Sequence, residues 1–589
     1  MQEPKLMRLR AAMQVAQIDA YIVPSSDPHQ SEYVADYWNS RAWLSGFTGS
    51  AGLLVVTQDW AGLWTDSRYF LQAETQLKDS GINLHKVLPN QANDYRDYLG
   101  KQLTAGSKIG LDGRLFSVQQ LERLEQKLAD FELQIVSHLD LIDDIWGSRP
   151  KLPKAPIFDF PIEYSGHARA EKLAGIRQQM HLQNTDVYLV SALDEIAWLF
   201  NLRGQDTDYN PVFYAYAAIQ HDVAYLFLDL DKVSENLTQK LERKSVILRA
   251  YRDFPNYLKR LYEGRTVLLS PSTFPAQLYD LLSTEVIEQK SLIQTQKTIK
   301  NEVEIAHLRK TMELDGVALL KLYRWLEKEA GKRSISEYEI GKQLTHFRAQ
   351  QTDFVSPSFA SIVGYNANGA IVHYRAEKNN CAQVEQHGML LIDSGGQYLT
   401  GTTDITRTTT LGLPTNNQKR HFTLVLKGHI ALADIRFPKG TNGHQLDSLA
   451  RQFLWCEQLN YGHGTGHGVG FFLNVHESPP SISSSSSRLT ELKPGMVFSN
   501  EPGYYETDQY GIRIENLLLC VPANEADNFL QFETLSLFPI DRQLINIDLL
   551  SKKEIIWLNQ YHQEVEERLS PFLSTEEKRW LQKQCIMIK

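Results

Sequence analysis

The sequence is poor in cysteine and has no long apolar run. Its four cysteines are scattered without any CxxC spacing, at Cys381, Cys456, Cys520 and Cys585. This scatter argues against a zinc ribbon or a disulfide framework and favours a reducing compartment. The N-terminal segment MQEPKLMRLRAAMQ carries charges throughout, unlike a signal peptide, and no stretch approaches the roughly 18 apolar residues of a membrane span. We therefore expect a cytoplasmic protein that does not associate with membranes.

The chain also lacks an excess of basic residues. Lys and Arg number 61 against 70 Asp and Glu, which gives a formal net charge of -9. No basic patch favours a nucleic acid as partner, so none is expected. Hydrophobic residues make up 42% and charged residues 22%, as in an ordinary soluble protein. At 589 residues the chain is too long for one core, and its length predicts three or four domains.

One stretch of about 140 residues, from His373 onward, concentrates metal-ligating side chains. Five potential ligands follow one another in the order Asp393, Asp404, His467, Glu501 and Glu515. The first two lie in LLIDSGGQYLTGTTDITRT (390–408), where an apolar run, a glycine-containing turn and a Thr/Ile-rich run predict a hairpin. A hairpin can bring both carboxylates to one place.

The same arrangement recurs for the two glutamates. Glu501 and Glu515 lie in NEPGYYETDQYGIRIENLLL (500–519), with proline and glycine as turn signals. Between the two pairs, YGHGTGHGVG (461–470) supplies two more histidines, His463 and His467, on a backbone too rich in glycine for an ordinary helix.

Four carboxylates and one imidazole form a ligand set suited to Mn²⁺, Zn²⁺, Co²⁺ or Fe²⁺ rather than to a thiolate site. Four carboxylates in one pocket repel one another, so a metal-free site is expected to hold protons. Two divalent ions would balance the four negative charges and could activate water and polarise a carbonyl group. Each carboxylate taken alone could instead be a surface or capping group.

Other catalytic motifs do not fit the sequence. The glycine-rich loop lacks the Gly-Lys-Ser/Thr ending of a P-loop. The segment VHESPP lacks the second histidine of an HExxH site, and SGFTGSAG has no GxSxG elbow that would make Ser50 a nucleophile.

The ordered ligands, together with HGTGHGVG, NEPG and RIEN, resemble the pita-bread metallopeptidases, which include methionine aminopeptidase, prolidase and Xaa-Pro aminopeptidase. Three further segments resemble the N-terminal domain of the long, three-domain Xaa-Pro aminopeptidases: PSSDPHQSEY (24–33), SGFTGSAG (45–52) and LWTDSRYFLQA (63–73). The resemblance covers nearly the whole chain. It implies an α/β (α+β) fold with two tandem creatinase-like domains followed by a pita-bread catalytic domain.

An internal repeat supports this organisation. Residues 171–204 repeat the earlier order of helix, Asp, short strand, polar turn and Trp-Leu segment ending in glycine. Chance likeness between two α/β stretches is the alternative. With the proline-rich segment 149–161 as a linker, we expect domains at 1–148, 149–294 and 295–589, the last with a C-terminal extension from about 525.

The resemblance also implies roles for individual residues. Asp393 and Asp404 would hold one metal ion, Asp404 and Glu515 would bridge two, and His467 and Glu501 would complete the second. Glu501 would also act as a base. Non-ligand roles at the substrate carbonyl, the proline ring and the proton path, and beside the metals, would fall to His373, His463, His476 and Arg513.

The implied activity is hydrolysis of the bond between an N-terminal residue and a penultimate proline. Two divalent ions are expected, Mn²⁺ first and Zn²⁺ or Co²⁺ as alternatives, in a homodimer. A prolidase-type dipeptidase uses the same five ligands and remains open, although the duplicated N-terminal domain and the long tail favour the aminopeptidase. A non-catalytic pita-bread binding module and a metal-free creatinase-like hydrolase are disfavoured by the intact ligand set.

Overall fold

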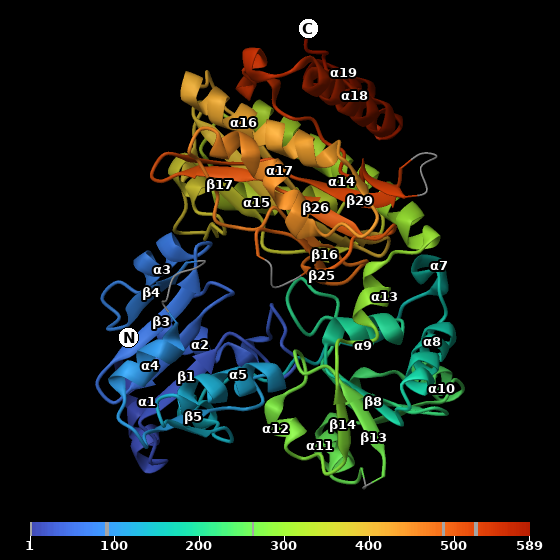
Figure 1. The fold of residues 1–589 in the computed structure, drawn as a ribbon. Coiled ribbons are helices and arrows are strands. Elements are labelled where there is room, and N and C mark those ends of the chain that lie inside the picture. The colour runs from blue at the N-terminus through green and yellow to red at the C-terminus, as the bar shows by residue number, and fades with distance from the viewer. Residues whose placement is uncertain (1–2, 89–93, 262–263, 486–488, 524–527) are drawn as a thin grey trace. The chain divides into compact units, whose positions relative to one another are not determined.

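The chain forms two compact units (Figure 1). The computed structural model describes residues 3–88, 94–261, 264–485, 489–523 and 528–589. Unit 1 comprises Met1–Ile162 and His167–Gln294, and unit 2 comprises Glu163–Gly166 and Thr295–Lys589. Among the described residues, no helix combines the length and apolar character needed to cross a membrane.

Unit 1 contains two six-stranded sheets with matching strand order. The first runs β4-β3-β2-β1-β5-β6 and the second runs β12-β11-β10-β8-β13-β14. In each sheet the strand that follows the first helix pairs antiparallel on one side and parallel on the other. The strands of the first sheet are β1 Ala20–Pro24, β2 Leu53–Thr57, β3 Ala61–Asp66, β4 Asn83–Val87, β5 Lys108–Leu111 and β6 Gln134–Val136. Those of the second are β8 Val187–Val190, β10 Ala215–Ile219, β11 Ala224–Leu228, β12 Val246–Ala250, β13 Thr266–Leu269 and β14 Glu285–Glu288.

The repeat extends to single hydrogen bonds. The backbone NH of Asp19 donates to the Lys108 carbonyl over 2.8 Å, and the Lys108 NH donates back to the Asp19 carboxylate over 2.8 Å. Asp186 and Thr266 make the same pair of bonds, over 2.9 and 2.8 Å. In both sheets an aspartate before the strand thus fixes the register of the parallel partner, as expected for two copies of one domain.

The helices of unit 1 flank these sheets. Apolar residues recur at helical spacing from Leu6 to Ala16, but α1 ends at Val15, because Gln17 takes a left-handed φ of 54° and the chain then turns into β1. The principal helices are α1 Glu3–Val15, α2 Ser40–Ser45, α4 Tyr95–Gln102, α5 Val118–Ala129, α8 Arg169–Leu182, α9 Leu193–Leu199 and α10 Glu235–Glu242.

Unit 2 surrounds its strands with helices, and the fold as a whole is the mixed α/β class expected from the sequence. One three-stranded sheet runs β17-β19-β22, and a six-stranded sheet runs β23-β30-β29-β26-β24-β25, where β23 is Arg436–Pro438 and β30 is Phe529–Thr534. The strands that carry the site are β17 Ile362–Tyr365, β19 Met389–Ser394, β22 Ile405–Thr410, β24 Gly466–Gly468, β25 Glu477–Ile482, β26 Val497–Asn500, β27 Gly503–Glu506, β28 Tyr510–Arg513 and β29 Asn516–Pro522. The helices are α14 Glu302–Glu329, α15 Glu337–Arg348, α16 Asn416–Ala433, α17 Gly443–Trp455, α18 Lys552–Leu569 and α19 Thr575–Gln584.

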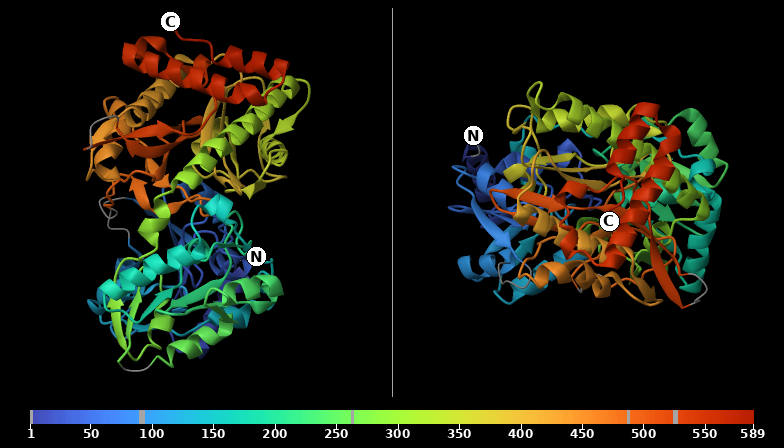
Figure 2. Two further views of the ribbon diagram at one scale, coloured as in Figure 1. Left: turned by 90° about the vertical axis from the view of Figure 1, so that its right-hand side faces the viewer. Right: turned by 90° about the horizontal axis from the view of Figure 1, so that it is seen from above.

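The start of the long helix α14 follows from the sequence at Asn301. The Asn301 side chain accepts hydrogen bonds from the NH groups of Val303 and Glu304, and the Glu304 carboxylate accepts from the Asn301 NH. This capping box satisfies NH groups that the first turn leaves unpaired. The C-terminal helices α18 and α19 lie side by side and pack against α14 (Figure 2).

Two short segments near the site do not follow their local sequence pattern. The serine-rich segment 481–488 has the low-complexity composition of a loop, but its beginning belongs to β25, where Ile482 pairs with Gly466 and is fully buried. Residues 486–488 lie outside the described part. The sequence GIRIEN alternates as a regular strand would, but β28 ends at Arg513 and β29 begins only at Asn516.

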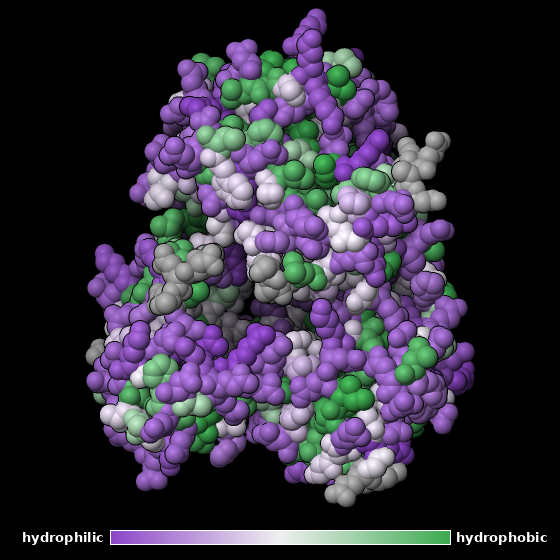
Figure 3. Space-filling view, viewed as in Figure 1, coloured by the Kyte–Doolittle hydropathy of each residue, from purple (hydrophilic) through white to green (hydrophobic). Residues whose placement is uncertain are grey.

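Figure 3 shows one face, which is mainly hydrophilic with hydrophobic residues in small groups. Scattered apolar residues of this kind are normal for a folded domain and need no special explanation.

Candidate metal centre

The first two candidate ligands lie where β19 gives way to a long turn. Asp393 is near the end of β19, paired with Ile362 of β17 on one side and Thr406 of β22 on the other. Asp404 lies one residue before β22. Both are buried, with 7% and 4% of their surface exposed. The expected hairpin is therefore present as the antiparallel pair β19 and β22, with the short strands β20 Gly396–Tyr398 and β21 Gly401–Thr402 inserted in its turn.

His467 lies in β24 of the six-stranded sheet, and Glu501 is the first residue after the neighbouring strand β26. A Cβ on Gly466 would lie 2.0 Å from the carbonyl oxygen of Ser499, so glycine is required for β24 to approach β26. The Ser499 hydroxyl accepts from the His467 NH over 2.9 Å and donates to the Glu501 carboxylate over 3.1 Å. One serine therefore fixes the positions of both candidate ligands.

The His467 ring is oriented by its own strand. Its Nδ1 lies 2.9 Å from the Gly468 carbonyl, to which it donates. This leaves Nε2 facing the carboxylates of Asp404 and Glu501, at 3.4 and 3.5 Å. A neutral imidazole held in this way presents a lone pair to a metal.

Glu515 joins the site through β22. Its backbone NH donates to the Thr406 carbonyl over 3.1 Å, and the Thr406 hydroxyl donates to the Glu515 carboxylate over 2.6 Å. Glu515 is 1% exposed. Because Thr406 is also paired with Asp393, this threonine connects the two sheets at the site.

The assembled side chains fit divalent metal ions. Ligand atoms of Asp404, His467 and Glu515 all lie within 4.8 Å of one another. The Oδ1 atom of Asp393 is buried without a hydrogen-bond partner. A buried, unpaired carboxylate oxygen beside a cluster of carboxylates is costly unless a cation compensates it.

The pKa values of the candidate ligands also indicate that the metal-free centre has too little positive charge for its carboxylates. Burial, reinforced by the charges of Asp404 and Asp393, raises the pKa of Glu515 well above its ordinary value. Burial raises the pKa of Glu501 to about 7, although His467 opposes this shift. For His467, burial lowers the pKa, but hydrogen bonding to Asp404 and the charge of Glu501 outweigh it and raise the pKa to about 9. The metal-free centre thus holds protons that metal binding would displace.

A cation and a phenol line one side of the centre. Arg513 is 1% exposed and donates to Asp393 over 2.5 Å and to the Tyr505 hydroxyl over 2.7 Å. The Tyr505 hydroxyl lies 2.7 Å from Nε2 of His463, whose Nδ1 donates to the Gly464 carbonyl over 2.7 Å. These contacts form a continuous path from Asp393 through Arg513 and Tyr505 to His463.

The other two candidate histidines approach from separate loops. The His476 ring packs edge-on against His467, with ring centroids 4.4 Å apart. His373 follows Val372, whose carbonyl accepts from Arg513 over 3.5 Å. The structure therefore places all nine sequence-predicted residues, five ligands and four non-ligands, around one region of unit 2.

Sequence reasoning missed the groups that support the ligands from behind. Arg407 is 2% exposed and donates to the Glu515 carbonyl over 2.6 Å and to the Asn516 side chain over 2.8 Å. Arg348 pairs with Asp315 of α14 and donates to the Gly395 carbonyl in the turn after Asp393. An arginine that alternates with threonines, as in DITRT, is typical of a solvated strand residue, so this role of Arg407 could not be predicted from the local pattern.

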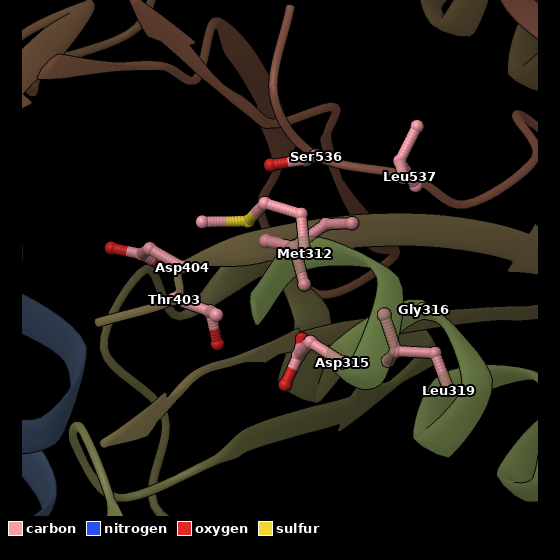
Figure 4. A pocket seen from close by; sticks show the side chains of 9 residues that line it. Met312, Asp315, Gly316, Leu319, Thr403, Asp404, Ser536 and Leu537 are labelled. Atoms are coloured by element: carbon pink, nitrogen blue, oxygen red, sulfur yellow. The ribbon is translucent and has the colours of Figure 1, made fainter. Parts of the chain in front are cut away.

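A small gap lies behind Asp404. It has no room for a water molecule and is bounded by α14 and by the segment after β30 Phe529–Thr534. Figure 4 shows the Asp404 carboxylate pointing away from Met312 and Asp315, which line this gap. Asp315 is already bound by Arg348 and by the Tyr398 hydroxyl. The gap is therefore space in the core and not the substrate site.

Models of known protein families match nearly the whole chain. Residues 306–522 match the model of metallopeptidase family M24, and residues 528–588 match the C-terminal region of peptidase M24. Two separate models of a creatinase/prolidase N-terminal domain match residues 5–145 and 148–304.

Individual relatives match along nearly the whole length. Aminopeptidase P2 of Arabidopsis thaliana is 41% identical, over 94% of this chain and 84% of that protein. Xaa-Pro aminopeptidase 1 of Dictyostelium discoideum is 40% identical, over 97% of this chain and 93% of that protein.

Solved structures agree. The X-prolyl aminopeptidase of Caenorhabditis elegans, described as a cytosolic enzyme with a di-nuclear active site, has a TM-score of 0.96 at 35% identity and covers 100% of both chains. The Xaa-Pro dipeptidase of Bacillus anthracis, at 22% identity and a TM-score of 0.52, covers 63% of this chain and 99% of its own. The latter likeness shows a shared fold alone. The chain therefore belongs to the Xaa-Pro aminopeptidase (aminopeptidase P) family of M24 metallopeptidases.

Proposed function

We propose that this chain removes the N-terminal residue from peptides whose second residue is proline. The observation that carries this proposal is the convergence of Asp404, His467 and Glu515 within 4.8 Å, in a chain that matches Xaa-Pro aminopeptidases along its length. The buried, unpaired oxygen of Asp393 adds a fourth ligand atom.

The site would hold two divalent ions. Asp393 and Asp404 would bind one, His467 and Glu501 the other, and Asp404 and Glu515 would bridge them. We propose Mn²⁺, with Zn²⁺ or Co²⁺ as alternatives, because the ligands are mainly carboxylates. Bound ions of this kind lower the pKa of water and polarise a carbonyl group.

The protein's own groups perform the proton transfers. Glu501, placed beside the second ion, would accept the proton of the attacking water. His373 would donate a hydrogen bond to the substrate carbonyl oxygen as negative charge develops there. His463 and His476 would contact the proline ring and supply the proton that the leaving nitrogen requires.

Arg513 and Tyr505 would hold this arrangement in place. Arg513 fixes Asp393 through one NH group and Tyr505 through another, and Tyr505 in turn contacts His463. A charge-assisted bond of this kind sets orientation as well as energy. Proline specificity follows if the site is shaped for a ring at a nitrogen that carries no NH.

The activity is tested by comparing three peptides at equal concentration. Ala-Pro-Ala should be cleaved after the first residue, whereas Ala-Ala-Ala should be cleaved far more slowly. Cleavage of the dipeptide Ala-Pro alone would show a prolidase and would contradict the proposal.

The assembly and location are further proposals. We propose a cytoplasmic homodimer with domains at 1–148, 149–294 and 295–589. The relative from Caenorhabditis elegans, described as cytosolic, supports the location. Light scattering on the purified chain tests the oligomer, since a monomer mass would contradict it.

A further inference from the structure

Glu337 is a buried carboxylate that the proposed chemistry does not use. It is the first residue of α15, a helix whose N-terminus is capped by the Ser336 hydroxyl. Glu337 is 0% exposed. A carboxylate at such a depth needs several hydrogen bonds to compensate for its lost hydration. Its position at a helix N-terminus also favours a negative charge.

The donors to Glu337 all come from one segment of unit 2. Its Oε1 accepts from the Tyr365 NH over 2.7 Å, and its Oε2 accepts from the Tyr374 hydroxyl over 2.7 Å and the Ala382 NH over 2.8 Å. The Asn368 amide donates to both oxygens over 3.0 Å. The Glu337 NH in turn donates to the Ala382 carbonyl over 3.1 Å. One carboxylate therefore joins both ends and the middle of residues 365–382, hereafter the His373 segment.

The His373 segment lies against the metal centre on its other side. A Cβ on Gly511 of β28 would lie 1.7 Å from the Gly369 carbonyl oxygen, so the two backbones are in direct contact. The Val372 carbonyl accepts from Arg513, which also binds Asp393. His373 follows immediately, with Tyr374 as the next residue. Glu337 on one side and Arg513 on the other thus fix the segment on both flanks of His373.

We propose that Glu337 is a positioning residue that sets the place of the His373 imidazole at the substrate carbonyl. The proposal rests on the role proposed above for His373. A carboxylate group accepts hydrogen bonds, and all four groups that face the Glu337 carboxylate are donors. Burial and the bond to Glu337 raise the pKa of Tyr374, so this phenol remains a donor.

The Glu337→Gln variant keeps the size of the side chain but replaces one acceptor with an amide NH₂ group. That group must face one of the donors, and the backbone NH of Tyr365 or Ala382 cannot turn away. We expect kcat for Ala-Pro-Ala to fall by about 10- to 100-fold with little change in KM. In hydrogen-exchange measurements the amides of Tyr365 and Ala382 should exchange faster.

A double-mutant cycle separates positioning from general damage. If Glu337 acts through His373, Glu337→Gln should have little further effect on kcat in a His373→Ala background. If Glu337→Gln lowers kcat by the same factor in the His373→Ala background as in the native protein, the proposal is overturned. Unchanged hydrogen exchange at the amides of Tyr365 and Ala382 would also overturn it. Full activity of His373→Ala alone would instead contradict the proposed role of His373.

Two controls accompany the cycle. Glu339→Gln, in the same helix, alters an ion pair with Arg333 that is about two-fifths exposed and should leave activity unchanged. Tyr374→Phe removes one donor without placing a second donor against the carboxylate, so it should lower kcat less than Glu337→Gln. If Glu337→Gln does not fold, Tyr374→Phe replaces it in the cycle, and an unchanged kcat in that variant would overturn the proposal.

Discussion

At the scale of single residues, the centre is a concentration of negative charge that the protein only partly compensates. Arg513 pairs with Asp393, yet burial still raises the pKa of that aspartate. Glu501 and Glu515 have raised pKa values for the same reason. The residues are thus held in an arrangement that suits cations and is unfavourable without them.

The role of Glu501 as the base can be tested with a single substitution. Glu501→Gln keeps the contact with Ser499 but removes the proton acceptor, so kcat for Ala-Pro-Ala should fall by about 10²-fold or more. Steady-state kinetics with metal in excess checks this. An unchanged kcat would show that Glu501 is not the base, and equal thermal unfolding of the two proteins serves as the control for folding.

At the scale of elements, buried polar side chains attach the helices to the metal-binding strands. His429 of α16 is fully buried and lies 3.1 Å from the Asn500 carbonyl and 3.2 Å from the Asn516 amide. These two residues adjoin Glu501 and Glu515 in sequence. Arg407 contacts the Glu515 carbonyl, the Phe538 carbonyl and the Tyr561 hydroxyl of α18. The C-terminal extension is thereby connected to a ligand strand.

His429 predicts how stability depends on pH. Burial, and then the charge of Arg407, lower its pKa from 6.5 to about 3. Between the folded-state pKa of about 3 and the ordinary pKa of 6.5, the unfolded chain binds a proton at His429 that the folded chain does not. The stability that neutral His429 contributes is therefore present above pH 6.5 and is lost as the pH falls. From pH 7.5 to pH 5 the native protein should lose about 2 kcal/mol more of its free energy of unfolding than His429→Gln. Urea unfolding at both pH values measures this, and equal losses would contradict the assignment.

Tyr561 tests the connection between α18 and the metal site. Tyr561→Phe removes a hydroxyl that lies 2.8 Å from Arg407 and leaves a buried guanidinium with one fewer partner. The free energy of unfolding should fall by about 1–3 kcal/mol. Retention of metal during dialysis should fall as well, because Arg407 also contacts Glu515. Gln563→Ala, an exposed change in the same helix, is the matched control, and identical behaviour of the two variants would argue against the connection.

The sequence predicted elements well where their determinants are local. The Asn301 cap, the apolar runs of β2 and β3 and the glycines around His467 can all be recognised in short stretches of sequence. The break between β28 and β29, which separates Arg513 from Glu515, could not be predicted in this way. The hydrogen bonds from the NH groups of these two residues go to Thr408 and Thr406, more than 100 residues earlier. Arg407 and Glu337 escaped notice for the same reason, since their partners are distant in sequence.

At the scale of the whole molecule, the metal centre lies entirely within unit 2. Unit 1 has its own cores, formed around the two six-stranded sheets, with Leu9 and Tyr21 in one and Leu189 and Phe254 in the other. The matching strand order of these sheets, and not the five ligands, separates this chain from shorter pita-bread hydrolases. The domain boundaries at 148/149 and 294/295 stay predictions.

The location of the ligands predicts where metal binding acts on stability. Added Mn²⁺ should slow hydrogen exchange in β19, β22, β26 and β29 of unit 2, because a ligand stabilises only what binds it. Amides of β1 and β8 in unit 1 should exchange at unchanged rates. Slowing confined to unit 1 would place the metal elsewhere.

The most direct test of the account measures bound metal and activity in the same samples. The purified protein is stripped with a chelator and then titrated with Mn²⁺, while metal content and the rate of Ala-Pro-Ala cleavage are followed. We predict that the rate is lost on stripping and returns as binding approaches two ions per chain. Full cleavage that survives exhaustive removal of metal would contradict the account.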